Sequence, residues 1–152
     1  MWKILTLAGL MMTGIALAAE KSPGIAVIKE WKGANATQEA PKRIVVEDQK
    51  GWDQKGWEEV WSGMEGNVQP KPETPKIDFD KHKVIAVFMG RRMTGGYSVK
   101  ITGVEENGKL VVKVKESGPP PGAMVTMALT SPYHVMVVPK TDKPVEFVTE
   151  KK

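Results

Sequence analysis

Apolar residues along this chain follow two spacings, and each spacing predicts a different kind of element. Residues 84–89 (VIAVFM) are apolar without interruption, which is typical of a central strand covered on both faces. Six other segments have the alternation or the composition of short strands: 25–31, 43–47, 97–102, 125–129, 133–138 and 145–148. The chain is therefore expected to be dominated by strands.

One segment has helical spacing instead. Trp57, Val60, Trp61 and Met64 recur at intervals of three and four residues, and polar residues fall between them. This spacing predicts an amphipathic helix with an aspartate N-cap and a glycine near its end: Asp48 or Asp53, and Gly63 or Gly66. The tryptophans are expected to pack against a sheet, although stacked aromatic rings could also bind a sugar.

A hairpin is predicted at Asn107-Gly108, because a type I′ turn requires a positive φ at both central residues. A two-residue turn there predicts three cross-strand pairs: Ile101 with Val114, Gly103 with Val112, and Lys100 with Lys115. Together the patterns predict a β-rich α+β domain. It would be a largely antiparallel sheet or compact sandwich of about seven strands with one amphipathic helix.

The first residues have the composition of a targeting segment. Lys3 precedes an apolar run to Ala16, and Ala16-Leu17-Ala18 is a small-x-small cleavage site. The apolar run is too short to span a bilayer, and charged residues follow it closely. Residues 1–18 are therefore predicted to be a signal peptide, and the mature protein is predicted to be periplasmic or secreted.

Composition narrows the function classes. The absence of cysteine excludes disulfides, thiol catalysis and a lipid-modified cysteine as membrane anchor. Cleavage of the signal peptide lowers the Lys and Arg count from 22 to 21 against 18 acidic residues, a net charge of +3. The charges are mixed, without the basic cluster of a nucleic-acid or lipid-surface binder. About 130 residues suffice for one domain with one core.

The stretch GRRMTGGYSV, residues 90–99, is the strongest candidate for a functional loop. A phosphate-binding loop would open into a helix, whereas Gly95-Gly96 opens into an alternating strand pattern. A turn explains the glycines but not two arginines and a methionine at its centre. Contact with another protein would explain them, since arginine and tyrosine are enriched at binding hot spots.

Metal and catalytic signals are weak. Asp78, Asp80 and His82 would share one face of an extended segment, as in a weak metal site, but a polar strand entrance into the buried run at Val84 is the favoured explanation. Ser131 and His134 lie close in sequence without the orienting acid and oxyanion donors of a catalytic triad. A packed histidine is the simpler expectation. We therefore expect no enzyme, no metal and no cofactor.

The chain resembles the PrcB family of protease-complex subunits between about Arg43 and Phe147. The resemblance rests on the order of several short motifs: Trp57-x3-Trp61, Pro75-x-Ile-Asp78-Phe79, an apolar strand ending at Gly90, Thr94-Gly95-Gly96-Tyr97, Pro119-Pro120-Pro121-Gly122 and Ser131-Pro132-Tyr133-His134. It implies an exported subunit that associates with a protease, and a division into signal peptide (1–18), N-terminal segment with one short strand (19–42) and PrcB-like domain (43–152).

Two loops of the chain, at Thr94-Gly95-Gly96-Tyr97 and at Pro132-Tyr133, are also similar to loops of chagasin-type cysteine-protease inhibitors. The corresponding inhibitor loops are Thr-Thr-Gly-Tyr and Arg-Pro-Trp, in the same order. If the strands after them run in the same direction, both loops emerge at one end of the domain. The candidate partner-binding residues are Arg91, Arg92, Met93, Tyr97, Pro132, Tyr133 and His134.

These observations favour an exported, non-enzymatic interaction module, an accessory or stabilising subunit for a secreted or envelope protease. A loop-based protease inhibitor and a small-ligand or glycan binder that uses the tryptophans are the alternatives.

Overall fold

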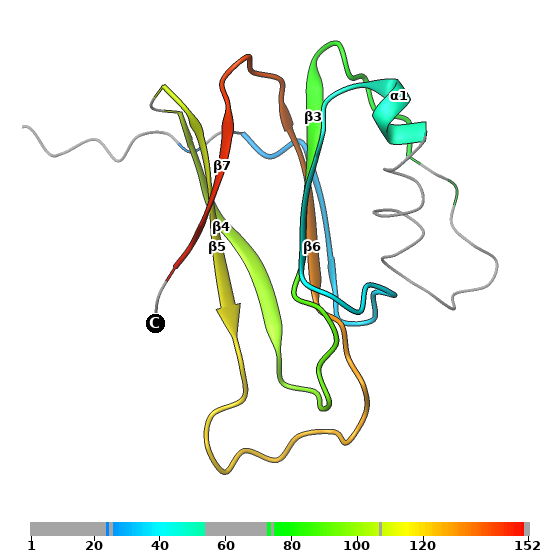
Figure 1. Ribbon diagram of the computed structural model, residues 1–152, viewed down its shortest axis with the longest axis vertical. Coiled ribbons are helices and arrows are strands. Elements are labelled where there is room, and N and C mark those ends of the chain that lie inside the picture. The colour runs from blue at the N-terminus through cyan, green and yellow to red at the C-terminus, as the bar shows by residue number, and fades with distance from the viewer. Residues whose placement is uncertain (1–23, 25, 54–72, 74, 107, 151–152) are drawn as a thin grey trace, which may run out of the picture.

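Two stacked β-sheets make up the described part of the protein (Figure 1). The computed structural model describes residues 24, 26–53, 73, 75–106 and 108–150. The expected β-rich fold, with seven mostly antiparallel strands, is confirmed. The amphipathic helix expected around Trp57 and Trp61 and the signal peptide lie outside the described residues.

The seven strands divide into a sheet of four and a sheet of three. The first sheet has the order β1-β6-β3-β2 and is antiparallel throughout: β1 (Lys29–Gly33), β6 (Tyr133–Pro139), β3 (His82–Phe88) and β2 (Lys42–Val46). The second has the order β4-β5-β7: β4 (Ser98–Glu106), β5 (Leu110–Ser117) and β7 (Val145–Thr149). Strands β5 and β7 are parallel, which the sequence patterns did not predict. A short helix, α1 (Gln49–Gly51), follows β2.

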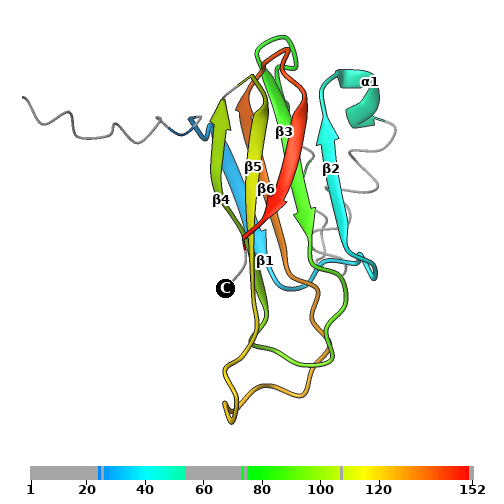
Figure 2. The same cartoon turned by 60° about the vertical axis from the view of Figure 1, so that its left-hand side comes forward.

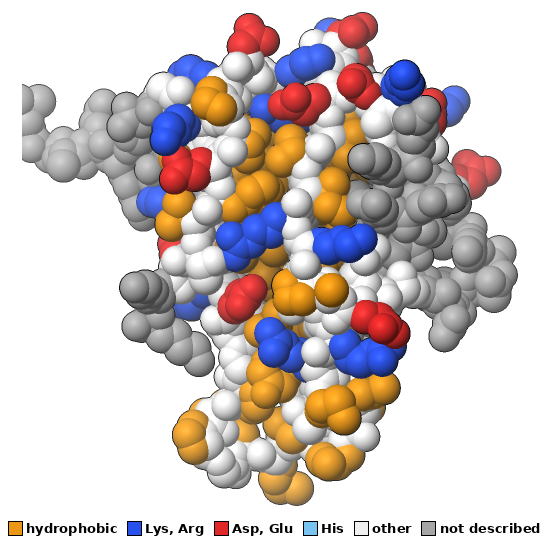
Figure 3. All heavy atoms as spheres, in the orientation of Figure 1, with side chains coloured by type: hydrophobic (Ala, Val, Ile, Leu, Met, Phe, Trp, Pro, Cys, Tyr) orange, Lys and Arg blue, Asp and Glu red, His pale blue; other side chains and the backbone are white. Residues whose placement is uncertain are grey.

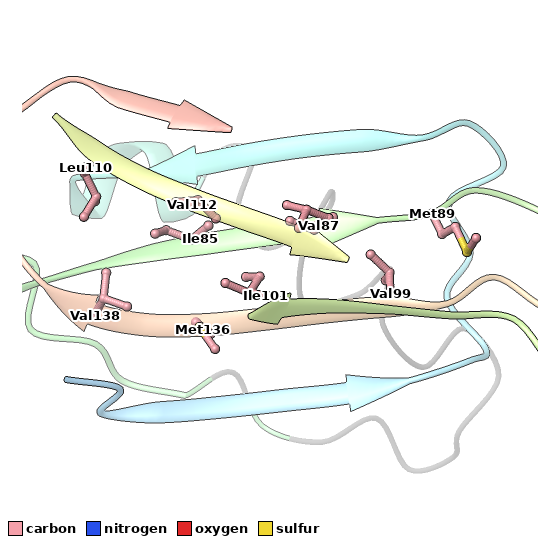
Figure 4. Close-up of a cluster of buried hydrophobic side chains, with 10 residues drawn as sticks. Ile85, Val87, Met89, Val99, Ile101, Leu110, Val112, Met136 and Val138 are labelled. Carbon is pink, nitrogen blue, oxygen red and sulfur yellow. The ribbon is translucent and has the colours of Figure 1, made fainter. Parts of the chain in front are cut away.

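Strand β3 is buried on both faces, as its uninterrupted apolar sequence predicts. Ile85 and Val87 point into the core between the two sheets, where they meet Ile101 and Val112 of the second sheet (Figure 4). Val84, Ala86 and Phe88 belong to a second apolar cluster on the other face of the first sheet. The central strands β3 and β6 therefore contribute side chains to two apolar clusters, one on each face of the first sheet.

The β4–β5 hairpin has the predicted register at its base and a different one near its turn. Ile101 pairs with Val114 and Lys100 with Lys115, as expected. The connection has three residues, because Glu106 pairs with Leu110, and Gly103 pairs with Lys113 instead of the predicted Val112. A β-bulge between Ile101 and Gly103 absorbs the extra residue of the turn, so the Ile101–Val114 pair keeps its predicted register, whereas Val112 pairs with Val104.

Two expected strands differ from the structure. The expected strand 25–31 begins at Lys29 and extends to Gly33 in the structure, and the Ile28 N–H before it donates to the Val137 carbonyl at 2.9 Å. The expected strand 125–129 is wrong: this segment is irregular, and the residues after it form only isolated bridges, Thr130 with Arg92 and Ser131 with Asn35. Asp48 is the N-cap of the short helix α1, because its carboxylate accepts the Gly51 N–H, whereas the amphipathic helix that it was predicted to cap lies outside the described residues. Within the described residues, no helix has the length and apolar character needed to cross a bilayer.

Candidate interaction site

Two loops project together from one end of the sandwich (Figure 1). They connect β3 to β4 and β5 to β6, and we call them the tip, defined as residues 90–97 and 118–131. Strands β4 and β6 both run away from this end (Figures 1 and 2). The expectation that the loops before these two strands emerge on the same side is therefore confirmed.

Backbone hydrogen bonds tie the two loops of the tip to each other. Arg92 and Thr130 exchange both of their N–H···O bonds, with N···O distances of 2.7 and 2.9 Å. The Gly95 N–H donates to the Thr126 carbonyl at 2.9 Å, and the Thr130 hydroxyl donates to the Thr94 carbonyl at 2.8 Å. The tip is thus a paired structure in which each loop positions the other.

The Gly95-Gly96 pair is explained by this close approach. A methyl group on Gly95 would collide with the Thr126 hydroxyl. Gly96 has a φ of +87°, and a β-carbon there would lie 2.9 Å from the Pro119 side chain. The glycines serve the packing of two loops rather than a phosphate.

Tyr97 supports the inner side of the tip. Its ring lies against Gly118, where an added β-carbon would be 3.1 Å from the ring edge. The Arg92 guanidinium stacks over the same ring, with its carbon 5.3 Å from the ring centroid. The Arg92 Nε is buried without a hydrogen-bond partner. Arg92 and Tyr97 therefore form part of the internal framework of the tip, and neither is a freely exposed side chain.

The outer side of the tip is apolar and exposed. Four side chains of the tip are largely open to solvent, with exposed fractions of 75% for Met93, 102% for Met124, 87% for Met127 and 57% for Leu129. Apolar side chains cover this end of the molecule in Figure 3. Met93 and Leu129 lie next to the Arg92–Thr130 pair on the two loops, which places them opposite each other. The tip thus combines an ordered backbone with an uncovered apolar surface.

A third segment braces the base of the tip. The Arg91 N–H donates to the Glu39 carbonyl at 2.9 Å, and the Arg91 guanidinium forms an ion pair with the Glu39 carboxylate. Ser131 donates through its hydroxyl to the Gln38 carbonyl at 2.7 Å. An open groove lies between residues 35–39 and Leu129. Arg91 is half-exposed here and can reach a partner beside the apolar surface.

Three of the expected contact residues are buried. Tyr133 and His134 begin β6, and Pro132 directly precedes it; the exposed fractions of Tyr133 and His134 are 3% and 0%. The Tyr133 ring packs on Phe88 and lies so close to Gly33 that a β-carbon there would collide with it. These side chains are therefore covered in this fold, and their contact with a partner stays a prediction.

His134 connects the two sheets. Its Nδ1 accepts the Ile101 N–H at 2.8 Å, so the ring proton is on Nε2, which donates to the Glu30 carboxylate at 2.9 Å. Burial lowers the pKa of His134, although Glu30 opposes this effect. The hydrogen bond from His134, aided by Lys32, lowers the pKa of Glu30. The expected packed histidine is confirmed, in its neutral form.

The weak metal pattern depended on an extended segment, and that premise is wrong. The Asp78 carbonyl accepts the N–H groups of Lys81 and His82, and its carboxylate accepts that of Asp80. This turn prevents Asp78, Asp80 and His82 from sharing one face of a strand. In the described part of the chain, no group of three His, Asp or Glu side chains is placed to hold a metal ion.

Met124, Met127 and Leu129 were missed as candidate contact residues, because the alternation of Val125, Met127 and Leu129 suggested a half-buried strand beginning directly after Met124. The adjacent Pro119-Pro120-Pro121-Gly122 was the available signal. Three prolines remove three N–H donors, and Gly122 has a φ of +77°. Such a break ends β5 and begins the connection to β6 in the other sheet, and apolar residues after it are as compatible with a loop as with a strand.

Comparison with family models gives a match over part of the chain. Residues 83–139 match the family model of the PrcB C-terminal domain, which confirms the resemblance over that segment. The matched residues contain β3 from Lys83 onward, β4, β5, β6 and both loops of the tip. No significant match was found among curated proteins or among solved structures.

Proposed function

We propose that this protein is a non-enzymatic interaction module that docks through its tip on a protein of an exported or envelope protease complex. One observation supports this most strongly: Met93, Met124, Met127 and Leu129 expose an apolar surface on a backbone that is held by hydrogen bonds between two loops. Exposed apolar groups on a rigid support are typical of binding surfaces. The PrcB match supports a partner related to proteolysis.

The residue types favour a protein over a lipid surface as the occupant of the tip. Methionine is flexible and polarisable, and it is frequent at protein-binding surfaces that adapt to a partner. Loops that enter a bilayer interface usually carry tryptophan or tyrosine at their apex. The exposed large apolar residues of the tip are three methionines and one leucine, and Tyr97 faces inward.

A photo-crosslinking experiment in the native cell tests this proposal. A photoreactive phenylalanine analogue is placed at Met127 on the tip or, as a matched control, at exposed Asp142 beyond the opposite end of β6. We expect Met127 to crosslink to a protease or to another subunit of its complex, and Asp142 not to do so. Equal labelling from both positions, or crosslinking of Met127 to lipid alone, would contradict docking through the tip.

The activity of the captured protease then separates two roles. An accessory subunit should lengthen the lifetime of its protease, whereas an inhibitor should lower the rate of substrate cleavage. The buried Pro132-Tyr133 pair does not reach the surface, so an inhibitor would have to act through the tip alone. The glycan-binding alternative depends on Trp57 and Trp61, which lie outside the described residues. Trp52, a tryptophan that the structure does describe, is only 3% exposed.

We also propose that the protein acts outside the cytoplasm, on the basis of the signal-peptide pattern in residues 1–18. The intact mass of protein recovered from the periplasm or medium should correspond to a chain that begins after Ala18 or Ala19. A cell-associated protein that retains Met1 to Ala18 would contradict export with cleavage.

A further inference from the structure

Sulfur in this protein is carried by methionine alone, because the sequence contains nine methionines and no cysteine. The methionines in the described residues fall into two sets. Met93, Met124 and Met127 are at least 75% exposed on the tip, whereas Met89 and Met136 are each 5% exposed in the core between the sheets. One set is thus open to dissolved oxidants, and the other is shielded by packed side chains.

The thioether of methionine is oxidised by peroxides when the oxidant reaches the sulfur. A sulfur lone pair attacks one peroxide oxygen, the O–O bond breaks, and a sulfur–oxygen bond forms. The departing oxygen takes up the protons and leaves as water or an alcohol. Sulfur is oxidised by two electrons and the peroxide is reduced by two. The product is a sulfoxide, a polar group where an apolar one stood, and reductases can reverse the change.

We propose that Met93, Met124 and Met127 form a peroxide-sensitive modification site, at which oxidation turns the tip from apolar to polar and weakens docking. This inference rests on the proposed docking function. All three side chains belong to the uncovered surface that is proposed to meet the partner. Sulfoxides there would have to be desolvated on docking, and an unpaired polar group in an interface lowers affinity.

The fold is built so that this change remains local. The two loops of the tip are joined by backbone and threonine groups, at Arg92–Thr130, Gly95–Thr126 and Thr94–Thr130, and no methionine sulfur takes part. Met89 and Met136 pack between the sheets, where peroxide has little access. Oxidation of the tip should therefore alter its surface without unfolding the sandwich.

The first test uses the mature protein and hydrogen peroxide. Peptide mass spectrometry follows the addition of one oxygen to each methionine over time, and thermal unfolding is measured on the same samples. We expect Met93, Met124 and Met127 to react several-fold faster than Met89 and Met136, with an unchanged unfolding temperature. Equal rates for the two sets, or unfolding in step with oxidation of the tip, would overturn the inference.

The second test measures the apolar character of the tip by retention on a phenyl chromatography matrix. Peroxide should shorten the retention of the wild type. A triple variant, Met93→Leu, Met124→Leu and Met127→Leu, should keep its retention under peroxide, because leucine is apolar and has no sulfur. The corresponding triple glutamine variant should elute early from the start. Retention of the wild type that does not respond to peroxide would overturn the inference.

These outcomes are separate from the fate of the proposed function. Crosslinking from Met127 identifies the partner without any oxidant, and its failure concerns docking alone. Once the partner is captured, peroxide should weaken its binding to the wild type and leave the leucine variant bound. Peroxide-resistant binding of the wild type would reject the oxidation proposal and leave docking through the tip in place.

Discussion

Tyr133 and Met127 lie close together in the chain, in segments with the same kind of apolar pattern, yet they have opposite environments. Tyr133 is 3% exposed in β6 and Met127 is 87% exposed on the tip. β6 pairs with β1 on one side and with β3 on the other. The segment of Met127 has no such ladder, and its neighbour Thr130 makes only a single bridge. An apolar residue is buried here only where neighbouring strands can cover it.

The difference also follows from where the core ends. Met89 and Val99 are core residues that adjoin the tip in sequence, and both sheets stop near them (Figure 4). Residues 123–129 extend past this layer, so their side chains find no opposite sheet. Met124 and Met127 are therefore exposed because the loop that carries them is long and extends beyond both sheets, although their side chains are apolar.

The largest effect is expected from truncating the buried member of this pair. Tyr133→Ala removes a ring that packs on Phe88 and against Gly33, and it should lower the free energy of unfolding by about 3–5 kcal/mol. Met127→Ala should stay within about 0.5 kcal/mol, as expected for an exposed side chain. Urea denaturation of both variants measures the contrast. Similar losses for the two would mean that the tip is packed more tightly than its exposure indicates.

An intermediate effect on stability is expected from adding a methyl group where the two loops of the tip touch. Gly96→Ala adds a methyl group 2.9 Å from Pro119 at a φ of +87°, and it should cost about 1–3 kcal/mol. Gly122→Ala is the matched control, because its φ is +77° but no atom lies within 4 Å of the new β-carbon. The difference between the two unfolding free energies isolates the loop contact. If it is zero, positive φ alone explains Gly96.

The buried histidine should make stability depend on pH. The pKa of His134 in the folded protein is lowered from 6.5, so the unfolded chain takes up the proton first as pH falls. The contribution of neutral His134 to stability is therefore fully present above about pH 6.5. Below that pH the free energy of unfolding decreases, by up to about 1.4 kcal/mol per pH unit for one proton. Glu30, whose pKa is lowered from 4.5, adds a loss of the same sign at lower pH. Urea midpoints between pH 7.5 and 4 measure this slope.

Two variants identify the residue whose titration makes the free energy of unfolding depend on pH. His134→Gln should remove the decrease that begins near pH 6.5, because glutamine does not titrate in this range. Glu30→Gln should retain it, since burial is the largest cause of the lowered His134 pKa and does not depend on Glu30. A slope that persists in His134→Gln would assign the titration to another group.

The smallest effect on stability is expected from the arginines of the tip. Arg91→Ala loses an exposed ion pair with Glu39, and Arg92→Ala loses stacking on Tyr97. Each should change the free energy of unfolding by about 0–1 kcal/mol. With the crosslinked partner in hand, Arg91→Ala should weaken binding by direct loss of contact. Binding as tight as that of the wild type would restrict the docking surface to the apolar residues.

The sequence by itself determined most of the strands, because uninterrupted or alternating apolar residues at 43–47, 84–89, 133–138 and 145–148 record local burial. The order of short motifs was sufficient to indicate the PrcB family, which residues 83–139 match. Arg91 and Met93 were also placed on a loop from sequence alone, and Tyr97 at the point where that loop meets the next strand.

Only the tertiary structure decided which apolar residues face solvent and which strands are neighbours. The alternation in 125–129 carries no information on whether a partner strand lies beside it, and Pro132 to His134 are covered by strands distant in sequence. Likewise, a three-residue turn and a bulge at Thr102 together preserve the predicted Ile101–Val114 pair. Local pattern reports the preferences of a segment, whereas burial is a property of the segments that meet in space.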